Sequence, residues 1–446
     1  MKIRTWILHL GVVVTLLISI VFSWLIWVNP TGFEQFRQSQ VNKSTTNDNI
    51  PEEAKKNLDD IYTPTSLMYT KATGKKVQLI NTKYDILQTT KATMNKVRII
   101  SIHQQDKAQY EHPINMRQAY ILNYSDILPL KLVAILFKQV PNNYKKFEKF
   151  NINQIVFPKG KPNIIYFGNS KTKEIFEVKV KYLDTVNIKK IEAKKNTHEL
   201  EINFEKFNDN QYRWTYPEGV KLPQYSYLLT KDTIGSFTNK LLGTSTSISS
   251  KEKDGLTIYS DGANQRLTLK NKLKTVEYIN YGIKQNLDDK NQSDNFNQIL
   301  RRNLNQLNSL GVSLDDIRYS TYSPKKKAID YRSYVSGFPI VSAEGYGDFR
   351  FTTLNGNGEK INFSLYSLQV PVPNNSSNVE LPSTNEVLDS FEKIGIQKNE
   401  IKEIKLAYAW HKNPSNNQVV DLKPTYYVKI GDTWMDYQSG KQENQE

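Results

Sequence analysis

The sequence predicts an α+β fold, in which a single N-terminal transmembrane helix is followed by a three-domain extracytoplasmic portion of antiparallel sheets packed with helices. Three observations predict it. Residues 6–28 are apolar, short stretches of alternating apolar and polar residues recur through the rest of the chain, and amphipathic segments that end at glycine lie between some of them. Strands joined by turn residues and interspersed with such helices are typical of α+β proteins.

The apolar N-terminal segment is long enough to cross a membrane. From Trp6 to Val28 it contains no Asp, Glu, Lys or Arg. As a helix it spans about 35 Å, and the hydrocarbon core of a bilayer is about 30 Å thick. A cleavable signal peptide is the alternative, but its apolar core covers about 7–15 residues and ends at small residues. This segment ends in the bulky sequence SWLIWVNP, so we expect a retained membrane span.

The charges beside the span predict its orientation. Lys2 and Arg4 precede it, and the first charged residue after it is Glu34. The positive-inside rule therefore assigns residues 1–5 to a cytoplasmic tail and everything after the span to the outside of the cell membrane. No later segment is long and apolar enough for a second crossing, so we expect a single-pass protein.

A stripe of small or hydroxylated residues runs along the predicted span. Gly11, Thr15, Ser19 and Ser23 recur at every fourth position, which places them on one face of a helix. Small residues let two membrane helices approach closely, and hydroxyls can bond across the interface, at about 0.6 kcal/mol each. The stripe therefore predicts a packing face for another membrane helix. The alternative is that each hydroxyl bonds to a carbonyl of its own helix.

Changes in composition divide the rest of the chain. The polar segment 29–50 reads as a linker, and it is followed by an N-terminal extracytoplasmic domain at 51–205, a central domain at 206–290 and a C-terminal domain at 291–446. In the first domain, SDILPLKLVAILF at 125–137 predicts a helix, and GNSKTK predicts the turn of a hairpin. In the central domain, a helix ending at Gly243 precedes the hairpin candidate GLTIYSDGANQRLTL.

The C-terminal domain has the clearest pattern. A helix is predicted from Ser293 to a stop at Gly311, and a second one follows Ser383, which forms a capping box with Glu386. The apolar face of the first helix is formed by Phe296, Ile299, Leu300, Leu304, Leu307 and Leu310. Alternating apolar residues in the strands between them predict a sheet with one buried face, namely Phe349, Phe351, Ile361, Phe363 and Leu365. Each of the two helices is followed by a glycine, a short polar link and a strand. This repetition indicates two copies of a unit in which a helix packs on a sheet.

The charge of the exterior permits two interpretations. Without Lys2 and Arg4, 58 basic side chains face 45 acidic ones, a net charge of +13. This favours anionic partners such as wall polymers, lipid headgroups or an acidic protein surface, or it serves only solubility. The 26 tyrosines likewise suit either packing or a sugar- or protein-binding surface. We expect no nucleic-acid partner outside a membrane. Because there is no cysteine, the chain has no disulfide.

No motif predicts chemistry. The five histidines are scattered, and the sequence has no metal-binding, phosphate-binding or nucleophile motif. Candidate acid–base carboxylates are Asp59–Asp60, Asp288–Asp289, Asp315–Asp316 and Glu344, all in turn or helix-end contexts where carboxylates cap amides or face water. We therefore expect no enzyme, no catalytic residue, no metal, no cofactor and no small-molecule ligand.

Several stretches of the chain carry a family resemblance. They are the span ending in LIWVNP, ILPL at 127–130, INQIVFP at 152–158, AIDYRSYVSGFPI at 328–340, FSLYSLQV at 363–370 and the closing PTYYVKIGDTWMDYQSGKQE. The Gly-aromatic-Pro element of the fourth stretch is Gly337, Phe338 and Pro339. With these stretches the sequence resembles the YycH family of membrane regulators.

The resemblance implies a function. It implies a three-domain α+β exterior and a non-enzymatic regulator that acts with a second single-span protein, YycI, on the sensor histidine kinase YycG, also called WalK. Cell-wall metabolism genes would be controlled through that kinase, and the membrane helices would contribute to the contact. The alternative is a membrane-tethered cell-wall-binding or cell-wall-modifying protein.

Overall fold

The computed structural model describes most of the chain after residue 54. The described residues are 55–81, 85–181, 196–208, 211–243, 248–283, 292–311, 316–354, 358–373, 378–431 and 433–438. They belong to one compact unit, Glu53–Glu446. The predicted cytoplasmic tail, membrane span and linker, residues 1–50, lie outside them. Within the described part, no helix is long and apolar enough to cross a membrane.

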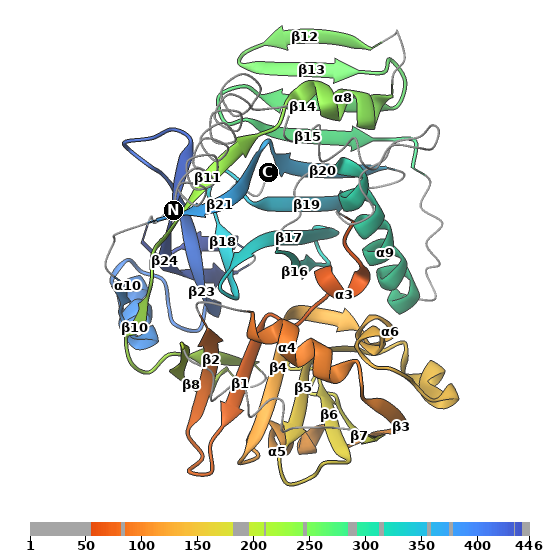
Figure 1. Ribbon diagram of the computed structural model, residues 1–446, viewed down its shortest axis with the longest axis vertical. Coiled ribbons are helices and arrows are strands. Elements are labelled where there is room, and N and C mark those ends of the chain that lie inside the picture. The colour runs from red at the N-terminus through yellow and green to blue at the C-terminus, as the bar shows by residue number, and fades with distance from the viewer. Residues whose placement is uncertain are drawn as a thin grey trace, which may run out of the picture. The chain divides into compact units, whose positions relative to one another are not determined.

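The described residues confirm an α+β fold built mainly from antiparallel strands, with few helices (Figure 1). The N-terminal sheet has nine strands in the order β3-β7-β6-β5-β4-β1-β2-β8-β9. Their bounds are β1 Ser66–Thr70, β2 Lys76–Asn81, β3 Arg98–Gln104, β4 Ala119–Pro129, β5 Asn151–Pro158, β6 Ile164–Gly168, β7 Ile175–Lys181, β8 Thr197–Asn208 and β9 Gln211–Thr215. The predicted GNSKTK hairpin is confirmed, because β6 and β7 pair Gly168 with Ile175.

Both faces of the N-terminal sheet are covered. In β5, Ile155 and Phe157 belong to one hydrophobic cluster and the intervening Val156 to another, and all three are fully buried. Alternate side chains of a strand point to opposite faces, so a strand buried on both sides reads as a continuous apolar run. Short helices cover the sheet: α4 Ile86–Met94, η2 Lys107–Gln109, α5 Glu111–Ile114, α6 Leu130–Val133, η3 Ala134–Leu136 and η4 Asn142–Phe147.

The prediction of a helix at 125–137 is wrong for its first residues, which form a strand. Strand β4 continues to Pro129, which pairs with Asn151 of β5 after a register shift. Helical structure begins only at Leu130, as the four residues of α6 and the three of η3. Pairing with β5 overrides local propensity here, and Pro129, which has no N–H to donate, ends the ladder and precedes the first helical turn.

The C-terminal sheet has fourteen strands. Its path is β12-β13-β14-β15-β20-β19-β17-β18-β23-β24-β11-β21, with β16 on β17 and β25 on β24. Their bounds are β11 Tyr225–Lys231, β12 Ser249–Lys253, β13 Leu256–Ser260, β14 Gln265–Lys270, β15 Thr275–Asn280, β16 Ile317–Ser323, β17 Ala328–Val335, β18 Phe338–Val341, β19 Asp348–Thr353, β20 Glu359–Ser364, β21 Tyr366–Val372, β23 Ile401–Lys412, β24 Val419–Ile430 and β25 Thr433–Asp436. β10 Val220–Leu222 and β22 Val379–Leu381 form a separate pair.

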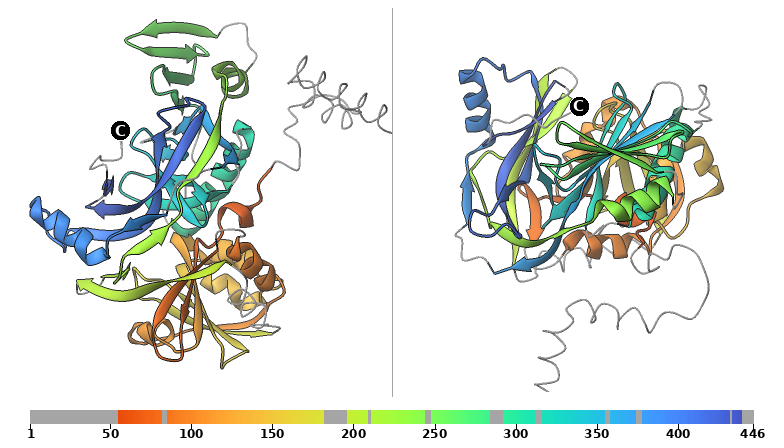
Figure 2. Two further views of the ribbon diagram at one scale, coloured as in Figure 1. Left: turned by 60° about the vertical axis from the view of Figure 1, so that its left-hand side comes forward. Right: turned by 90° about the horizontal axis from the view of Figure 1, so that it is seen from above.

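Strand pairing within the C-terminal sheet follows the predicted hairpins. β13 and β14 pair Ser260 with Arg266 around the SDGAN turn, as predicted. β19 and β20 pair Thr353 with Glu359, although residues 355–357 of the predicted NGNG turn lie outside the described part. Among the described strand pairs, β18 with β23 is parallel. Figure 2 shows β12, β13 and helix α8 Ile234–Leu242 at the end of this sheet that lies away from the N-terminal sheet.

Two longer helices confirm the clearest sequence predictions. Helix α9 Gln292–Leu310 buries the predicted apolar face, and Leu300, Leu307 and Leu310 have no exposed surface. These side chains share a cluster with residues of the strands β16, β17, β19 and β20 that follow. Helix α10 Thr384–Lys393 packs in the same way on Ile401, Ile404 and Leu406 of β23. Each helix thus lies with the antiparallel strands that come after it, in agreement with the two predicted helix-on-sheet units.

The predicted capping box of α10 is present and gives a direct test. Ser383 accepts from the Glu386 amide at 3.3 Å, and the Glu386 carboxylate accepts from the Ser383 amide at 2.7 Å. We expect Ser383→Ala to lower the free energy of unfolding by about 1 kcal/mol, because the Glu386 amide loses its acceptor and the Glu386 carboxylate loses the Ser383 hydroxyl that donates to it at 2.9 Å. Ser390→Ala, within the same helix, should change it by less than about 0.5 kcal/mol. Equal losses in chemical denaturation would exclude the cap as the cause.

A buried carboxylate within the C-terminal sheet predicts acid sensitivity. Asp330 of β17 accepts hydrogen bonds from Arg350 at 2.6 and 3.0 Å and from Thr321 Oγ1 at 2.8 Å. Desolvation by burial raises the pKa of Asp330, but Arg350 and these hydrogen bonds outweigh it and hold the pKa below its ordinary value of 3.8. The stabilisation is therefore complete above the unfolded-state pKa and is lost as the pH falls through the lower folded-state pKa.

We accordingly expect the wild-type protein to lose more stability than Asp330→Asn between about pH 6 and about pH 3. The asparagine has no charge to lose, so the difference between the two free energies of unfolding should narrow as the pH falls. Urea denaturation at a series of pH values measures that difference. If the difference between the two free energies of unfolding stayed constant over the whole pH range, Asp330 would not be a cause of the acid sensitivity.

Candidate functional site

The residues predicted to pack against another membrane helix, Gly11, Thr15, Ser19 and Ser23, lie outside the described residues. The carboxylates considered for catalysis are only partly described. Asp59 and Asp60 both pair with Lys91 Nζ, at 2.8 and 2.9 Å. Among the described residues, no group of three or more His, Cys, Asp or Glu is placed to hold a metal ion.

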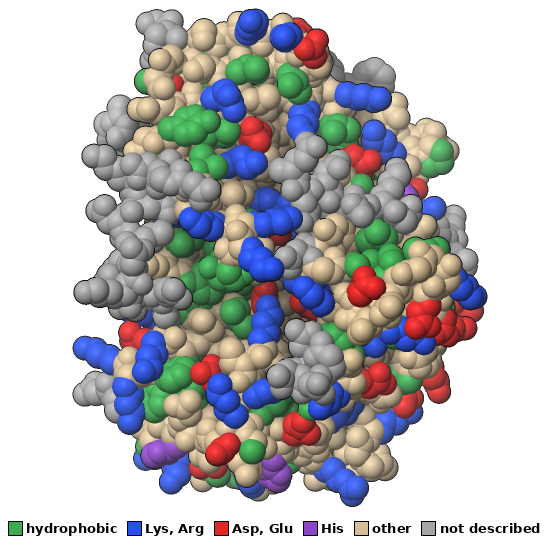
Figure 3. Space-filling model, turned by 180° about the vertical axis from the view of Figure 1, so that it is seen from behind, with side chains coloured by type: hydrophobic (Ala, Val, Ile, Leu, Met, Phe, Trp, Pro, Cys, Tyr) green, Lys and Arg blue, Asp and Glu red, His purple; other side chains and the backbone are tan. Residues whose placement is uncertain are grey.

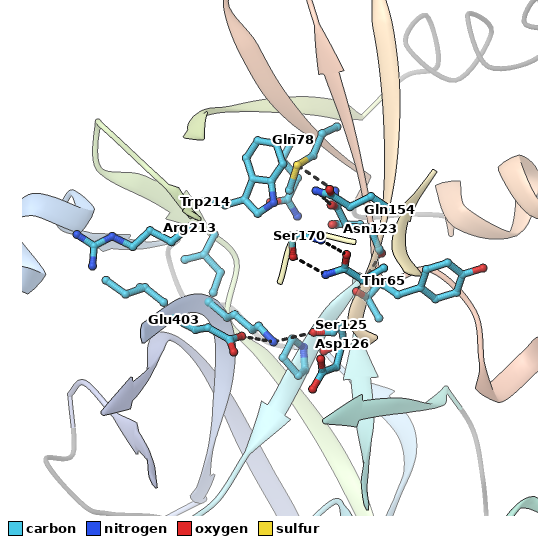
Figure 4. Close-up of a pocket in the computed structure, with 18 of the residues that line it drawn as sticks. Thr65, Gln78, Asn123, Ser125, Asp126, Gln154, Ser170, Arg213, Trp214 and Glu403 are labelled. Atoms are coloured by element: carbon cyan, nitrogen blue, oxygen red, sulfur yellow. Dashed lines mark hydrogen bonds and ion pairs between the residues drawn. The ribbon is translucent and has the colours of Figure 1, made fainter. Parts of the chain in front are cut away.

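The structure reveals a cavity of about 400 Å³ between the two sheets (Figure 4). Strands β1, β2, β4, β5, β8 and β9 of the N-terminal sheet contribute one side of it. The turn between β17 and β18, together with β23 and β24, contributes the other. At that turn Ser336 and Gly337 have φ values of 50° and 83°, a region that favours glycine, and the turn brings Phe338 and Pro339 to the cavity wall.

One side of the cavity is charged. Lys171 Nζ lies 2.6 Å from Asp126 Oδ1, and the amino groups of Lys405 and Lys429 lie 3.1 and 3.4 Å from the Glu403 carboxylate. Desolvation raises the pKa of Glu403, but the three lysines outweigh it and hold that pKa well below its ordinary value. The lining lysines and carboxylates are Lys171, Lys402, Lys405, Lys429, Asp126 and Glu403, with a net charge of +2.

Two of the lining cations tie strands from different parts of the chain together. Lys405 of β23 donates to the Ser125 carbonyl of β4 at 3.0 Å, which joins the two sheets across the cavity floor. Arg213 of β9 points away from the cavity centre in Figure 4, and its Nη1 donates to the Ile401 carbonyl at 3.2 Å. Lys405 therefore faces the cavity, whereas Arg213 supports its wall from behind.

Aromatic rings from the β8–β9 hairpin form a second side. The ring centroids of Phe204 and Trp214 are 4.6 Å apart, and the Phe204 ring stacks on Tyr212 at 4.9 Å. All three side chains are half-buried and line the cavity. These rings contribute to the apolar part of the lining, beside the amide and charged side chains.

Three buried amide side chains form a third side. Gln154 Nε2 donates to Asn123 Oδ1 at 3.0 Å, and Gln154 Oε1 accepts from Tyr110 at 2.6 Å. Gln78 Oε1 accepts from Tyr216 at 2.8 Å. Asn123 Nδ2 donates to the sulfur of Met68 at 3.1 Å, and a thioether is a weak acceptor. The cavity thus combines amides, cations and aromatic rings, an arrangement typical of ligand sites between domains.

Sequence reasoning did not find this site, although some of its signals were visible. The aromatic strand YRWTYP contributes Tyr212 and Trp214, and three stretches that carry the family resemblance contribute Gln154, Phe338 and Lys429. Nothing in the sequence indicates that these positions meet, because they are brought together only by the contact between the two sheets.

Comparisons with known proteins identify the family. Residues 2–198 match the family model described as YycH protein, N-terminal domain, and residues 212–443 match YycH protein, C-terminal domain. The crystal structure of YycH from Bacillus subtilis aligns with a TM-score of 0.68 at 15% identity, over 86% of this chain and 97% of that chain, which shows the same fold. An uncharacterized protein from Eubacterium rectale aligns over 53% of this chain and 85% of that chain at 11% identity. Its TM-score of 0.30 is too low to indicate a shared fold.

A search of curated proteins found no match to the sequence. The two family models together cover nearly the whole chain, and the second alone covers more than half of it. The structural alignment covers 86% of this chain and shows the same fold. The chain therefore belongs to the YycH family.

Proposed function

We propose that the chain is a non-enzymatic, membrane-anchored regulator of the sensor histidine kinase YycG/WalK that acts together with YycI and thereby controls cell-wall metabolism. Membership of the YycH family carries this proposal, since it supports a regulatory role in the YycG/WalK system. In this proposal residues 6–28 cross the cell membrane once and the exterior lies outside. The division of that exterior at 51–205, 206–290 and 291–446 stays a prediction.

The first described residues suggest how the anchor acts on the exterior. The Lys56 amide donates to Asn308 Oδ1 at 3.0 Å, and Asn308 Nδ2 donates back to the Lys56 carbonyl at 2.9 Å. The hydroxyl of Tyr62 lies 2.8 Å from that of Tyr331 and donates to the Leu300 carbonyl. The segment after the predicted linker is therefore held by helix α9 and strand β17, although the chain then continues into the N-terminal sheet.

This arrangement would transmit movement between the membrane and the C-terminal sheet. A regulator biases a kinase only through different affinities for its two states. A difference of about 1–3 kcal/mol would change the balance of those states about 5- to 150-fold. Contacts within the membrane and contacts outside it would both contribute, and the docked segment from Lys56 to Tyr62 would couple them.

Substitutions on the predicted packing face of the membrane span test this proposal. We expect Thr15→Leu combined with Ser19→Leu to reduce recovery of the kinase with this protein from solubilised membranes and to change transcription of the kinase's target genes. Bulky side chains at these positions would keep two helices apart. Val13→Leu combined with Val21→Leu alters the opposite face and should change neither. Full kinase recovery and unchanged transcription in the first variant would refute this contact.

The alternative proposal is a tethered wall-binding or wall-modifying protein. The cationic exterior favours it: Figure 3 shows Lys and Arg side chains spread over one face, with fewer Asp and Glu among them. A pull-down with purified peptidoglycan, followed by muropeptide analysis, separates the two proposals. Retention on the cross-linked polymer or altered muropeptides would support the alternative. Neither is expected of a regulator, because a cavity of about 400 Å³ would admit a short soluble fragment but not the polymer.

A further inference from the structure

We propose that the cavity between the two sheets binds a short anionic saccharide. No small-molecule ligand was predicted from the sequence, in which the residues involved are far apart. The inference goes beyond kinase regulation and does not depend on it. Aromatic, amide and charged side chains meet in this space (Figure 4).

The size and position of the cavity suit a small ligand. Its volume of about 400 Å³ lies within the range of about 300–1,000 Å³ that is usual for small-molecule sites. It lies between two sheets, and its lining includes strands from both. A ligand bound here would contact both sheets at once.

The aromatic side favours a sugar ring over a simple ion. Phe204 packs against both Tyr212 and Trp214, and Lys173 Nζ lies 3.7 Å from the centroid of the Tyr212 ring, so Trp214 offers the apolar face of this fixed cluster. The C–H face of a pyranose is apolar and flat, whereas its edge carries hydroxyls. A half-buried aromatic surface beside polar side chains matches those two properties, and a free inorganic anion would make no use of the rings.

The amide side offers hydrogen bonds to the edge of such a ring. Asn123 Nδ2 is occupied only by the sulfur of Met68 at 3.1 Å, which a hydroxyl or carbonyl oxygen of a ligand would replace as a better acceptor. The bond from Tyr216 to Gln78 Oε1 fixes the orientation of the Gln78 side chain, which lines the same wall. Both groups are therefore oriented before a ligand arrives.

The charged side requires an acidic group on the ligand. Lys405 and Lys429 share one carboxylate, that of Glu403, and Lys171 is paired with Asp126. Two cations on one carboxylate leave positive charge that a ligand carboxylate or phosphate would neutralise. An electrically neutral sugar would leave that charge unpaired, so the cavity should discriminate against it.

Binding to the full-length chain tests the proposal, in a detergent without a sugar headgroup and by isothermal titration calorimetry. The probe is the disaccharide of N-acetylglucosamine and N-acetylmuramic acid, which carries a carboxylate. The neutral disaccharide of N-acetylglucosamine has the same two rings without it, glycerol phosphate is an anion without a ring, and a short Glu-rich peptide represents acidic protein. We expect the acidic disaccharide to bind at least about tenfold more tightly than each of the others, which corresponds to about 1.4 kcal/mol.

Substitutions at two positions locate the binding. Trp214→Ala should weaken it about tenfold, whereas Trp214→Phe, which keeps a ring, should weaken it less. Lys429→Gln should weaken it about fivefold and reduce its dependence on salt, and Glu403 would keep Lys405 as its partner. Tyr281→Ala and Lys398→Gln, both exposed and outside the cavity, should leave binding unchanged.

Each other outcome overturns the proposal. Equal binding of the neutral disaccharide would refute the role of charge, and equal binding of glycerol phosphate would refute the role of the rings. Tighter binding of the acidic peptide would assign the cavity to a protein partner. No binding of any probe at millimolar concentration, with thermal unfolding of the protein unchanged, would also refute it. A failed kinase interaction would have no bearing on these results, so the two proposals can fail separately.

Discussion

Replacing Arg318 with methionine is expected to lower the free energy of unfolding by about 3–5 kcal/mol. Arg318 of β16 is 2% exposed, and its guanidinium lies 2.7 Å from Asp85 Oδ2 and 2.5 Å from Asp316 Oδ1. Its Nη1 also donates to the Pro64 carbonyl at 3.4 Å. Burial lowers the pKa of Arg318, but the two carboxylates outweigh this and raise it, so the side chain is charged at any physiological pH.

The size of the effect follows from what the substitution leaves behind. Asp85 caps α4 by accepting from the Leu87 amide at 2.8 Å, whereas Arg318 belongs to the C-terminal sheet, so this ion pair joins the two halves of the exterior. Without the arginine, two carboxylates stay close together with no cation between them. Removing one partner of a buried pair is more costly than the pair is stabilising, and burial already raises the pKa of the Asp316 carboxyl to about 6 with Arg318 beside it.

Arg266→Met makes the same chemical change at an exposed position and serves as the control. Arg266 is 45% exposed and lies 3.9 Å from Glu277, so its loss should cost less than about 1 kcal/mol. Urea denaturation of both variants, followed by far-ultraviolet circular dichroism, measures the difference. Similar losses in the two variants would show that Arg318 does not hold the halves together.

The second large effect is expected from Leu307→Ala, which should cost about 2–5 kcal/mol. Leu307 has no exposed surface and lies in the cluster formed by α9 and the strands beneath it. The substitution removes three buried carbon atoms and leaves a cavity that neighbouring side chains fill only in part. The same helix holds the segment after the membrane anchor, through Asn308 and the Leu300 carbonyl.

Leu307→Ala should therefore also loosen that segment. Hydrogen exchange of the amides from Lys56 to Tyr62 should become faster relative to those of the N-terminal sheet. Ile394→Ala is the control, since Ile394 is 68% exposed and its truncation should change stability by less than about 0.5 kcal/mol. Unchanged exchange at Lys56–Tyr62, despite the lower stability, would contradict the coupling of the anchor to α9.

The parts of the fold that sequence reasoning predicts well are those determined locally. Helices α9 and α10 each combine apolar positions at helical spacing with a terminating glycine, and Ser383 with Glu386 marks a helix start. The error at 125–137 has a physical cause as well. From Ile127 to Phe137 that stretch is apolar except for Lys131, so periodicity does not separate a buried strand from a buried helix. Its pairing partner, β5, decides the outcome.

The cavity could not be predicted for a different reason. Gln78, Trp214 and Lys405 come from three distant strands and meet only because the two sheets pack together. Their separate signals are ordinary: a buried amide, an aromatic strand and a lysine in a lysine-rich chain. The stripe of small residues in the membrane span is the opposite case. Its role as a packing face, which includes Thr15 and Ser19, follows from local spacing alone and stays a prediction.

In-cell crosslinking from the membrane span tests the central claim most directly. A photoreactive residue at Ser19 should form an adduct with the sensor histidine kinase YycG/WalK, because that position lies on the proposed packing face. The same residue at Val21, on the opposite face, should form much less of it. The account predicts this asymmetry in intact membranes. Absence of any kinase adduct from either position, with the protein present at its normal level, would contradict it.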